Sequence, residues 1–200
     1  MKHRWRIVGI GILTGLLLLG ALKVYQRYLW NRQGSYLVWA AYGGEIERVL
    51  DILKEHPELL NYQQKMELGC TPLLAACNGG SLWGKKSAEE RDKYVKLIYL
   101  LVEAGADVNA HATIHNETPL MYICMWGDDG VPAAKYLLER GADPCATNEY
   151  GGSILGYVPE DAPRMRKLIE EAVRERCKGK QRASNKDGIA TGVAKERNKE

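Results

Sequence analysis

The chain has 200 residues, 46% of them hydrophobic, which is enough for one domain with a buried core. Its formal net charge of +3 hides a separation, since residues 1–32 carry six basic side chains and no acidic ones, while residues 33–177 carry 15 basic and 22 acidic ones. The acidic body disfavours nucleic acid as a partner and favours a basic protein.

The N-terminal segment is apolar between basic flanks. An uncharged run from Ile7 to Leu22 follows Lys2, His3, Arg4 and Arg6. As a helix this run spans about 24 Å, close to the ~30 Å hydrocarbon core of a bilayer, and Trp5 and Val24 extend it. Its end lacks the paired small residues that a signal peptidase needs. We therefore expect an uncleaved transmembrane anchor, in preference to a cleaved signal or a buried soluble helix.

The orientation of this anchor is weakly determined by charge. Three Lys or Arg residues precede the run and three follow it, so the positive-inside rule nearly ties. The amino terminus and His3 favour an N-terminus in the cytoplasm, with the rest of the chain across the membrane. The alternative orientation places the rest of the chain on the cytoplasmic face. Gly11 and Gly15 form a G-x-x-x-G step that allows a weak dimer of anchors, although glycine is also common in membrane helices.

A short sequence motif recurs along residues 35–177. Its full copies begin at Thr71-Pro72-Leu73 and at Thr118-Pro119-Leu120, and degenerate copies begin at Ser35 and Ser153. A motif repeated at a near-fixed interval indicates small structural units that stack on one another. Thr before Pro is typical of a helix start, because the hydroxyl caps free amides and Pro suits the first turn. Each copy therefore predicts a helical unit.

These residues resemble the ankyrin repeat, whose pattern is T-P-L-H-x-A-A-x-x-G followed by V-x-x-L-L-x-x-G-A-D-V-N. Leu74 and Met121 stand where the family has His. The resemblance implies an all-α solenoid of about four helix-turn-helix repeats with finger loops, starting near residues 35, 71, 118 and 153. We expect an anchor over residues 1–32, a repeat domain over 33–177 and a disordered basic tail over 178–200.

An insertion lengthens the second repeat. Ser87 and Glu90 form a capping box, so the second helix of this repeat is predicted from Ala88 to Glu103. The insertion at residues 81–94 then includes a loop that presents Trp83. This side chain either contacts a partner or packs against its own repeat.

Five cysteines are present. Cys77 and Cys124 occupy the same position in adjacent repeats, about 10 Å apart, which is too far for a disulfide. Cys70, Cys145 and Cys177 fall in fingers or near the tail. We predict no disulfide framework, which counts against an oxidising compartment.

The motifs for enzyme chemistry are weak. Residues 79–85 read G-x-x-x-x-G-K, but Lys86 stands where a phosphate loop needs Ser or Thr, and a helix precedes it. His111 and His115 lie in a finger without a cluster of other ligands. We expect no catalytic site, no metal and no cofactor.

The resemblance implies that a protein partner meets the fingers and the exposed side of the first helices. Trp and Tyr often dominate the energetics of such interfaces, although packing between repeats explains the same aromatics. Carried over by position, and with the insertion added, the candidate binding residues are Trp39, Tyr42, Leu68, Asn78, Trp83, His115, Glu117, Tyr122, Met125, Trp126, Tyr150 and Tyr157.

Two functions fit this sequence. One is a scaffold or adaptor held at the bacterial inner membrane that binds a protein partner. The alternative is an immunity protein that neutralises a secreted antibacterial toxin acting on lipid or cell wall, because similar ankyrin-repeat proteins are encoded beside such toxins. Fold analogy alone does not separate them, and only the weak phosphate-loop likeness favours an enzyme.

Overall fold

The computed structural model describes the backbone of residues 2–64, 69–81 and 87–177, and their side chains except those of residues 2–17, 80 and 81. Leu68, Trp83 and the tail 178–200 lie outside the described residues, and so do residues 82–86 of the predicted insertion. Within the described part the fold is all-helical, with one isolated bridge between Thr147 and Ser153 and no strand.

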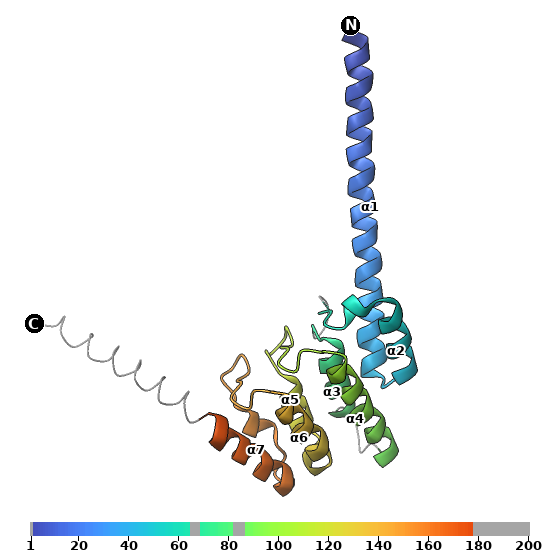
Figure 1. Ribbon diagram of the computed structural model, residues 1–200. Coiled ribbons are helices and arrows are strands. Elements are labelled where there is room, and N and C mark those ends of the chain that lie inside the picture. The colour runs from blue at the N-terminus through green and yellow to red at the C-terminus, as the bar shows by residue number, and fades with distance from the viewer. Residues whose placement is uncertain (1, 65–68, 82–86, 178–200) are drawn as a thin grey trace, which may run out of the picture.

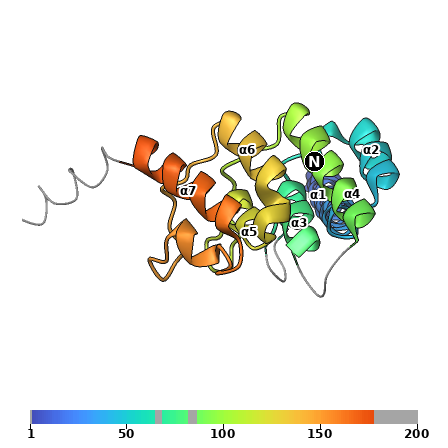
Figure 2. The same cartoon turned by 90° about the horizontal axis from the view of Figure 1, so that it is seen from below.

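The helices form two layers of a curved stack (Figures 1 and 2). The inner layer holds the end of α1 (Lys2–Tyr42), α3 (Pro72–Ser81), α5 (Pro119–Cys124) and the short 3-10 helix η3 (Ile154–Tyr157). The outer layer holds α2 (Ile46–Glu55), α4 (Ala88–Glu103), α6 (Val131–Glu139) and α7 (Pro163–Arg176). Two more 3-10 helices, η1 (Pro57–Leu59) and η2 (Gly127–Gly130), occupy connections. Finger loops precede the inner helices of the last three repeats. The described part of the first finger is residues 61–64 and 69–70, the second finger is residues 106–117 and the third is residues 142–152.

Local chemistry explains where the inner helices begin. The Thr71 hydroxyl accepts a hydrogen bond from Leu74 N at 3.3 Å, and the Thr118 hydroxyl accepts one from Met121 N at 3.4 Å. Pro follows each Thr, where its missing amide proton removes no helical bond. Pairs of buried alanines, including Ala75 and Ala76, let the helices approach closely. The two full copies of the motif thus form helices as predicted.

The capping box at the start of α4 is present as predicted. Glu90 N donates to Ser87 Oγ at 3.2 Å, and Ser87 N donates to the Glu90 carboxylate at 2.9 Å. These two bonds satisfy backbone amides that a helix start otherwise leaves open. As a result α4 runs from Ala88 to Glu103, the bounds expected from the sequence.

The fourth repeat departs from the expected pattern. Its inner helix is the single 3-10 turn η3, because Pro159 pushes the preceding Val158 into an extended conformation with φ −85° and ψ 120°. Its outer helix α7 is complete, and Asp128 holds its first turn by accepting from Met165 N at 2.9 Å and from Arg164 Nε at 3.2 Å.

The boundary expected at residue 32 falls inside one continuous helix. Helix α1 runs from Lys2 to Tyr42, and it includes both the predicted anchor and the first inner helix. Tyr62 of the first finger packs beside it, with a ring centroid 4.7 Å from that of Trp30 and a hydroxyl donating to Asn31 O at 3.3 Å. Among the described residues, none of the helices combines the length and apolar character that crossing a membrane requires. Residues 7–17 of the predicted anchor have side chains outside the description.

The prediction of no disulfide was wrong. Cys145 in the third finger bonds to Cys177 at the end of α7, with 5.7 Å between their Cα atoms. Sequence reasoning compared equivalent positions in adjacent repeats, whereas this bond joins a finger to the following outer helix. Arg176 reinforces the junction by donating to the carbonyls of Ala142 and Leu138 at 3.2 and 3.0 Å. Cys77 and Cys124 are buried free thiols, as expected.

Candidate protein-binding site

An apolar cavity opens between the first two inner helices. It has a volume of about 140 Å³ and is lined by Val38, Trp39, Tyr42, Gln64, Cys70, Ala75 and Asn78. Trp39 is 50% exposed at its rim, and its ring meets Tyr42 edge to face with 5.9 Å between centroids. A cavity of about 150 Å³ is large enough for benzene, so this one accepts a single side chain of comparable size.

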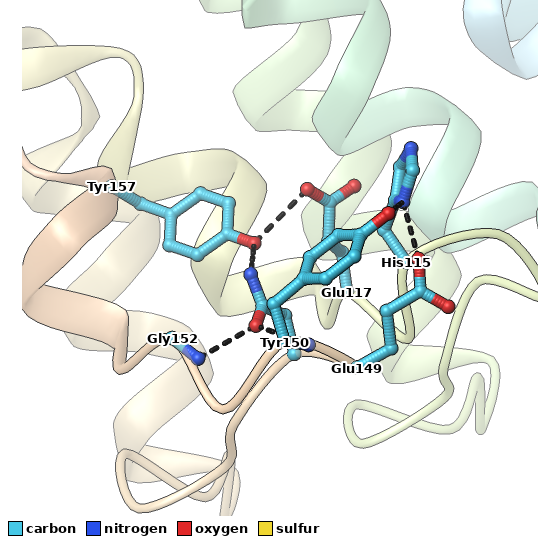
Figure 3. A network of polar contacts seen from close by, with 7 residues as sticks. His115, Glu117, Glu149, Tyr150, Gly152 and Tyr157 are labelled. Carbon is cyan, nitrogen blue, oxygen red and sulfur yellow. Dashed lines mark hydrogen bonds and ion pairs between the residues drawn. The ribbon is translucent and has the colours of Figure 1, made fainter.

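A polar network joins the second and third fingers to the fourth repeat (Figure 3). The Tyr157 hydroxyl donates to Glu117 Oε1 at 3.0 Å and accepts from the Asn148 side-chain amide at 2.9 Å. Asn148 Oδ1 in turn accepts from the backbone amides of Gly152 and Tyr150, at 2.7 and 3.0 Å. Figure 3 shows the Tyr157 hydroxyl and the Glu117 carboxylate pointing toward each other. The network therefore fixes the carboxylate between two repeats.

His115 forms the second part of this network. Its Nδ1 lies 2.6 Å from Glu149 Oε1 and 3.1 Å from the Tyr150 hydroxyl. The hydrogen bond with His115, followed by that from Tyr150, lowers the pKa of the Glu149 carboxyl below its ordinary value. Backbone geometry is also unusual here, since His115 and Asn116 both have positive φ, at 66° and 55°. These contacts order the tips of the second and third fingers against each other.

Glu117 acts on its neighbours from inside the network. Burial, and then the hydrogen bond with Glu117, raises the pKa of the Tyr122 hydroxyl. Burial, with a smaller contribution from the charge on Glu117, raises the pKa of the Cys70 thiol to about 11, so this thiol is protonated at neutral pH. Within the described residues no group of three or more His, Cys, Asp or Glu side chains is placed to hold a metal ion. The network holds two carboxylates, those of Glu117 and Glu149, beside phenol hydroxyls, and this arrangement suits recognition of a cation.

Basic and acidic side chains are distributed unequally between the inner and outer layers. Residues 97–134 and 141–163, which include the second and third fingers and the inner helices that follow them, contain no Lys or Arg. The same segments contain Asp107, Glu117, Asp143 and Glu149 in the fingers. Among the described side chains of residues 33–177, every Lys and Arg lies on an outer helix or caps its end. The face made by fingers and inner helices is therefore acidic.

The structure divides the predicted binding residues into groups. Trp39, Met125 and Tyr150 are exposed, at 50%, 40% and 74%. Tyr42, His115, Glu117 and Tyr157 are half-buried on the same face, whereas Asn78, Tyr122 and Trp126 are buried. The positions of Leu68 and Trp83 are outside the described residues. Only the exposed and half-buried groups present surface to a partner.

Trp126 shows why position in the repeat did not predict exposure. Its indole Nε1 donates to the carbonyl of Cys77 at 2.9 Å, and its ring meets Tyr94 edge to face at 6.4 Å. Both contacts belong to the preceding repeat, so the burial of Trp126 favours the packing alternative that the sequence left open. Tyr122 is likewise packed, with 5% exposure.

Sequence reasoning also missed part of the site. Gln64 and Cys70 both line the cavity, and Gln64 N donates to Cys70 O at 3.1 Å, so this bond holds the two positions together. No motif marks these two positions. Asn148 is a further such position, since its side chain holds together the third finger and Tyr157.

The family described as "Ankyrin repeats (3 copies)" matches residues 37–148, more than half of the chain. This protein therefore belongs to the ankyrin-repeat family, and η3 with α7 continues the stack beyond the matched residues. Ankyrin repeats are in general modules for protein–protein interaction. No curated protein matches the chain.

Proposed function

We propose that this protein is a membrane-tethered interaction module that binds a basic segment of a partner protein along its inner face. The carrying observation is that this face joins an apolar cavity, rimmed by the exposed Trp39, to fingers with acidic side chains. An apolar or aromatic side chain of the partner enters the cavity. A Lys or Arg of the same segment reaches the carboxylate of Glu117 between the fingers.

The cavity and the acidic fingers are expected to contribute to binding in different ways. Truncating a central Trp costs about 2 kcal/mol or more in many interfaces, because the ring is fully desolvated on binding. Peripheral charges such as Glu149 mainly speed association and make it sensitive to salt. Trp39 is thus expected to set affinity, and the acidic fingers to set partner choice.

The test is capture of the partner by tagged full-length chains. Trp39→Ala and Glu117→Gln should reduce capture, the first about thirtyfold for a loss of about 2 kcal/mol. Leu50→Ala is the matched control, because Leu50 is a 45% exposed apolar residue on the outer helix α2. Equal capture by all three variants would show that the inner face is not the binding site.

The tether is the second part of the proposal. The uncharged run from Ile7 to Leu22 and its basic flanks support a single-pass anchor, with the repeats on the periplasmic side of a bacterial inner membrane. Alkaline phosphatase fused after Glu200 should then be active and green fluorescent protein dark. The reverse pair of results would place the repeats in the cytoplasm.

A second candidate is an immunity protein against a secreted toxin. The observation that favours it is the bond between Cys145 and Cys177, since disulfides persist in oxidising compartments such as the periplasm. The first check is whether a secreted toxin is encoded beside this protein. If one is, cells that produce it should survive with the wild-type chain and die with Trp39→Ala. Survival with neither chain would remove this candidate and leave the adaptor.

A further inference from the structure

The direction in which α1 leaves the stack determines where the fingers point. Each finger precedes an inner helix, so its tip lies at that helix's N-terminal end, and the N-terminal part of α1 continues from the same end of the first inner helix. Figure 1 shows the fingers projecting to the side on which α1 rises from the stack. The contacts of Tyr62 with Trp30 and Asn31 fix the first finger against α1.

Only a short length of α1 separates the end of the uncharged run from the residue that Tyr62 contacts. Leu22 ends the uncharged run, and Asn31, which accepts from Tyr62, follows nine residues later, or about 14 Å along a helix. The headgroup layer takes up roughly 5–8 Å of this distance on each side of the hydrocarbon core. Tyr62, in the described part of the first finger, therefore stands within about one helix diameter, ~10–12 Å, of the headgroups.

The charges on the fingers and on the lipid surface determine which kind of partner fits between them. The second and third fingers carry acidic and no basic side chains, so an anionic lipid surface repels them. A basic protein is attracted both to anionic lipid and to the acidic fingers. The two surfaces together select a segment that already lies on the membrane.

We infer that the inner face opens toward the membrane that holds the chain, and that its partner is a basic protein bound to that membrane surface. This inference rests on the proposed tether and names the class of partner. The continuous helix α1 supplies the orientation, because it holds the fingers toward the bilayer with no loop between the predicted anchor and the first repeat.

The first experiment needs no partner. Nitroxide labels are placed on Tyr150→Cys, at the tip of the third finger, and on Asp161→Cys, at the opposite end of the same repeat, in full-length chains reconstituted into vesicles with nickel-chelating headgroups. The labels select the introduced thiols because Cys70, Cys77 and Cys124 are buried. Relaxation by nickel should be severalfold stronger at residue 150 than at residue 161. Equal or reversed relaxation in chains that float with the vesicles would overturn the inference and leave the tether intact.

A spacer variant tests the partner class. Seven helix-forming residues inserted between Gln26 and Arg27 move the fingers about 10 Å from the bilayer and nearly preserve their face. Capture of a myristoylated decalysine peptide on vesicles should fall severalfold, while binding of unmodified decalysine in detergent stays unchanged. Undiminished capture on vesicles would overturn the inference. Chains that fail to float with vesicles would contradict the tether and the inference together.

Discussion

Burial of Trp126 makes it a residue on which the stack depends. Its ring packs against Tyr94 and its Nε1 satisfies the carbonyl of Cys77, which is otherwise left without this donor. Trp126→Ala should lower the free energy of unfolding by about 3–5 kcal/mol, as for other large-to-small core changes. Urea unfolding monitored by circular dichroism measures the loss.

Trp126→Phe is the matched variant, because it keeps an aromatic ring but removes the donor together with the five-membered ring that carries it. It should lose roughly 1–3 kcal/mol, the penalty for an unsatisfied buried group. A stability unchanged by both substitutions would mean that the ring is not packed between repeats.

Glycine at residue 79 is required by close approach of two repeats. A Cβ at this position would overlap the carbonyl of Tyr42 and the ring of Tyr94, whose hydroxyl donates to that same carbonyl at 2.9 Å. Gly79→Ala should therefore destabilise the fold by roughly 1–3 kcal/mol, as overpacking does. Gly156→Ala is the control, since nothing lies within 4 Å of its Cβ position. A thermal scan that finds both variants equally stable would contradict this packing.

At the scale of elements, α1 is expected to stabilise the repeats through residues before the first repeat. A chain that starts at Gln26 keeps the contact of Trp30 with Tyr62, whereas one that starts at Gln33 loses it together with the bond to Asn31 O. The longer chain should be more stable by about 1–3 kcal/mol, the sum of an aromatic pair and one hydrogen bond.

Trp30→Ala in the longer chain provides the control for helix length. It should remove the share of the difference that comes from the aromatic pair in chemical unfolding, and leave the share that comes from the bond to Asn31 O. A difference that this substitution does not reduce at all would instead come from the length of the helix.

Elements with local signals were predictable, and those set by distant contacts were not. The capping box of Ser87 and Glu90 fixed the start of α4, and the Thr-Pro pairs fixed α3 and α5, because each signal acts within one helical turn. The shortness of η3 depends on Pro159, which restricts the conformation of Val158. The side that Trp126 faces depends on another repeat, and no local pattern contains that information.

The disulfide acts on the whole stack because it closes the last repeat. The bond between Cys145 and Cys177 joins positions separated by 32 residues. Replacing both with Ser should lower the free energy of unfolding by about 2–4 kcal/mol, since a loop of this length is constrained in the unfolded chain. Addition of a reductant to the wild-type chain should give the same loss in a calorimetric scan. A wild-type chain insensitive to reductant would show that the two thiols are not joined.

The central claim is that a basic protein binds the inner face, and site-specific photocrosslinking in cells tests it most directly. A photoreactive amino acid replaces Trp39 or Met125 on the inner face, or Leu50 or Lys96 on the outer helices, one position in each chain. Mass spectrometry then identifies the crosslinked peptide. We expect positions 39 and 125 to yield one and the same partner, joined through a segment rich in Lys and Arg, and positions 50 and 96 to yield none of it. Crosslinks to a partner from positions 50 and 96 alone would contradict the account.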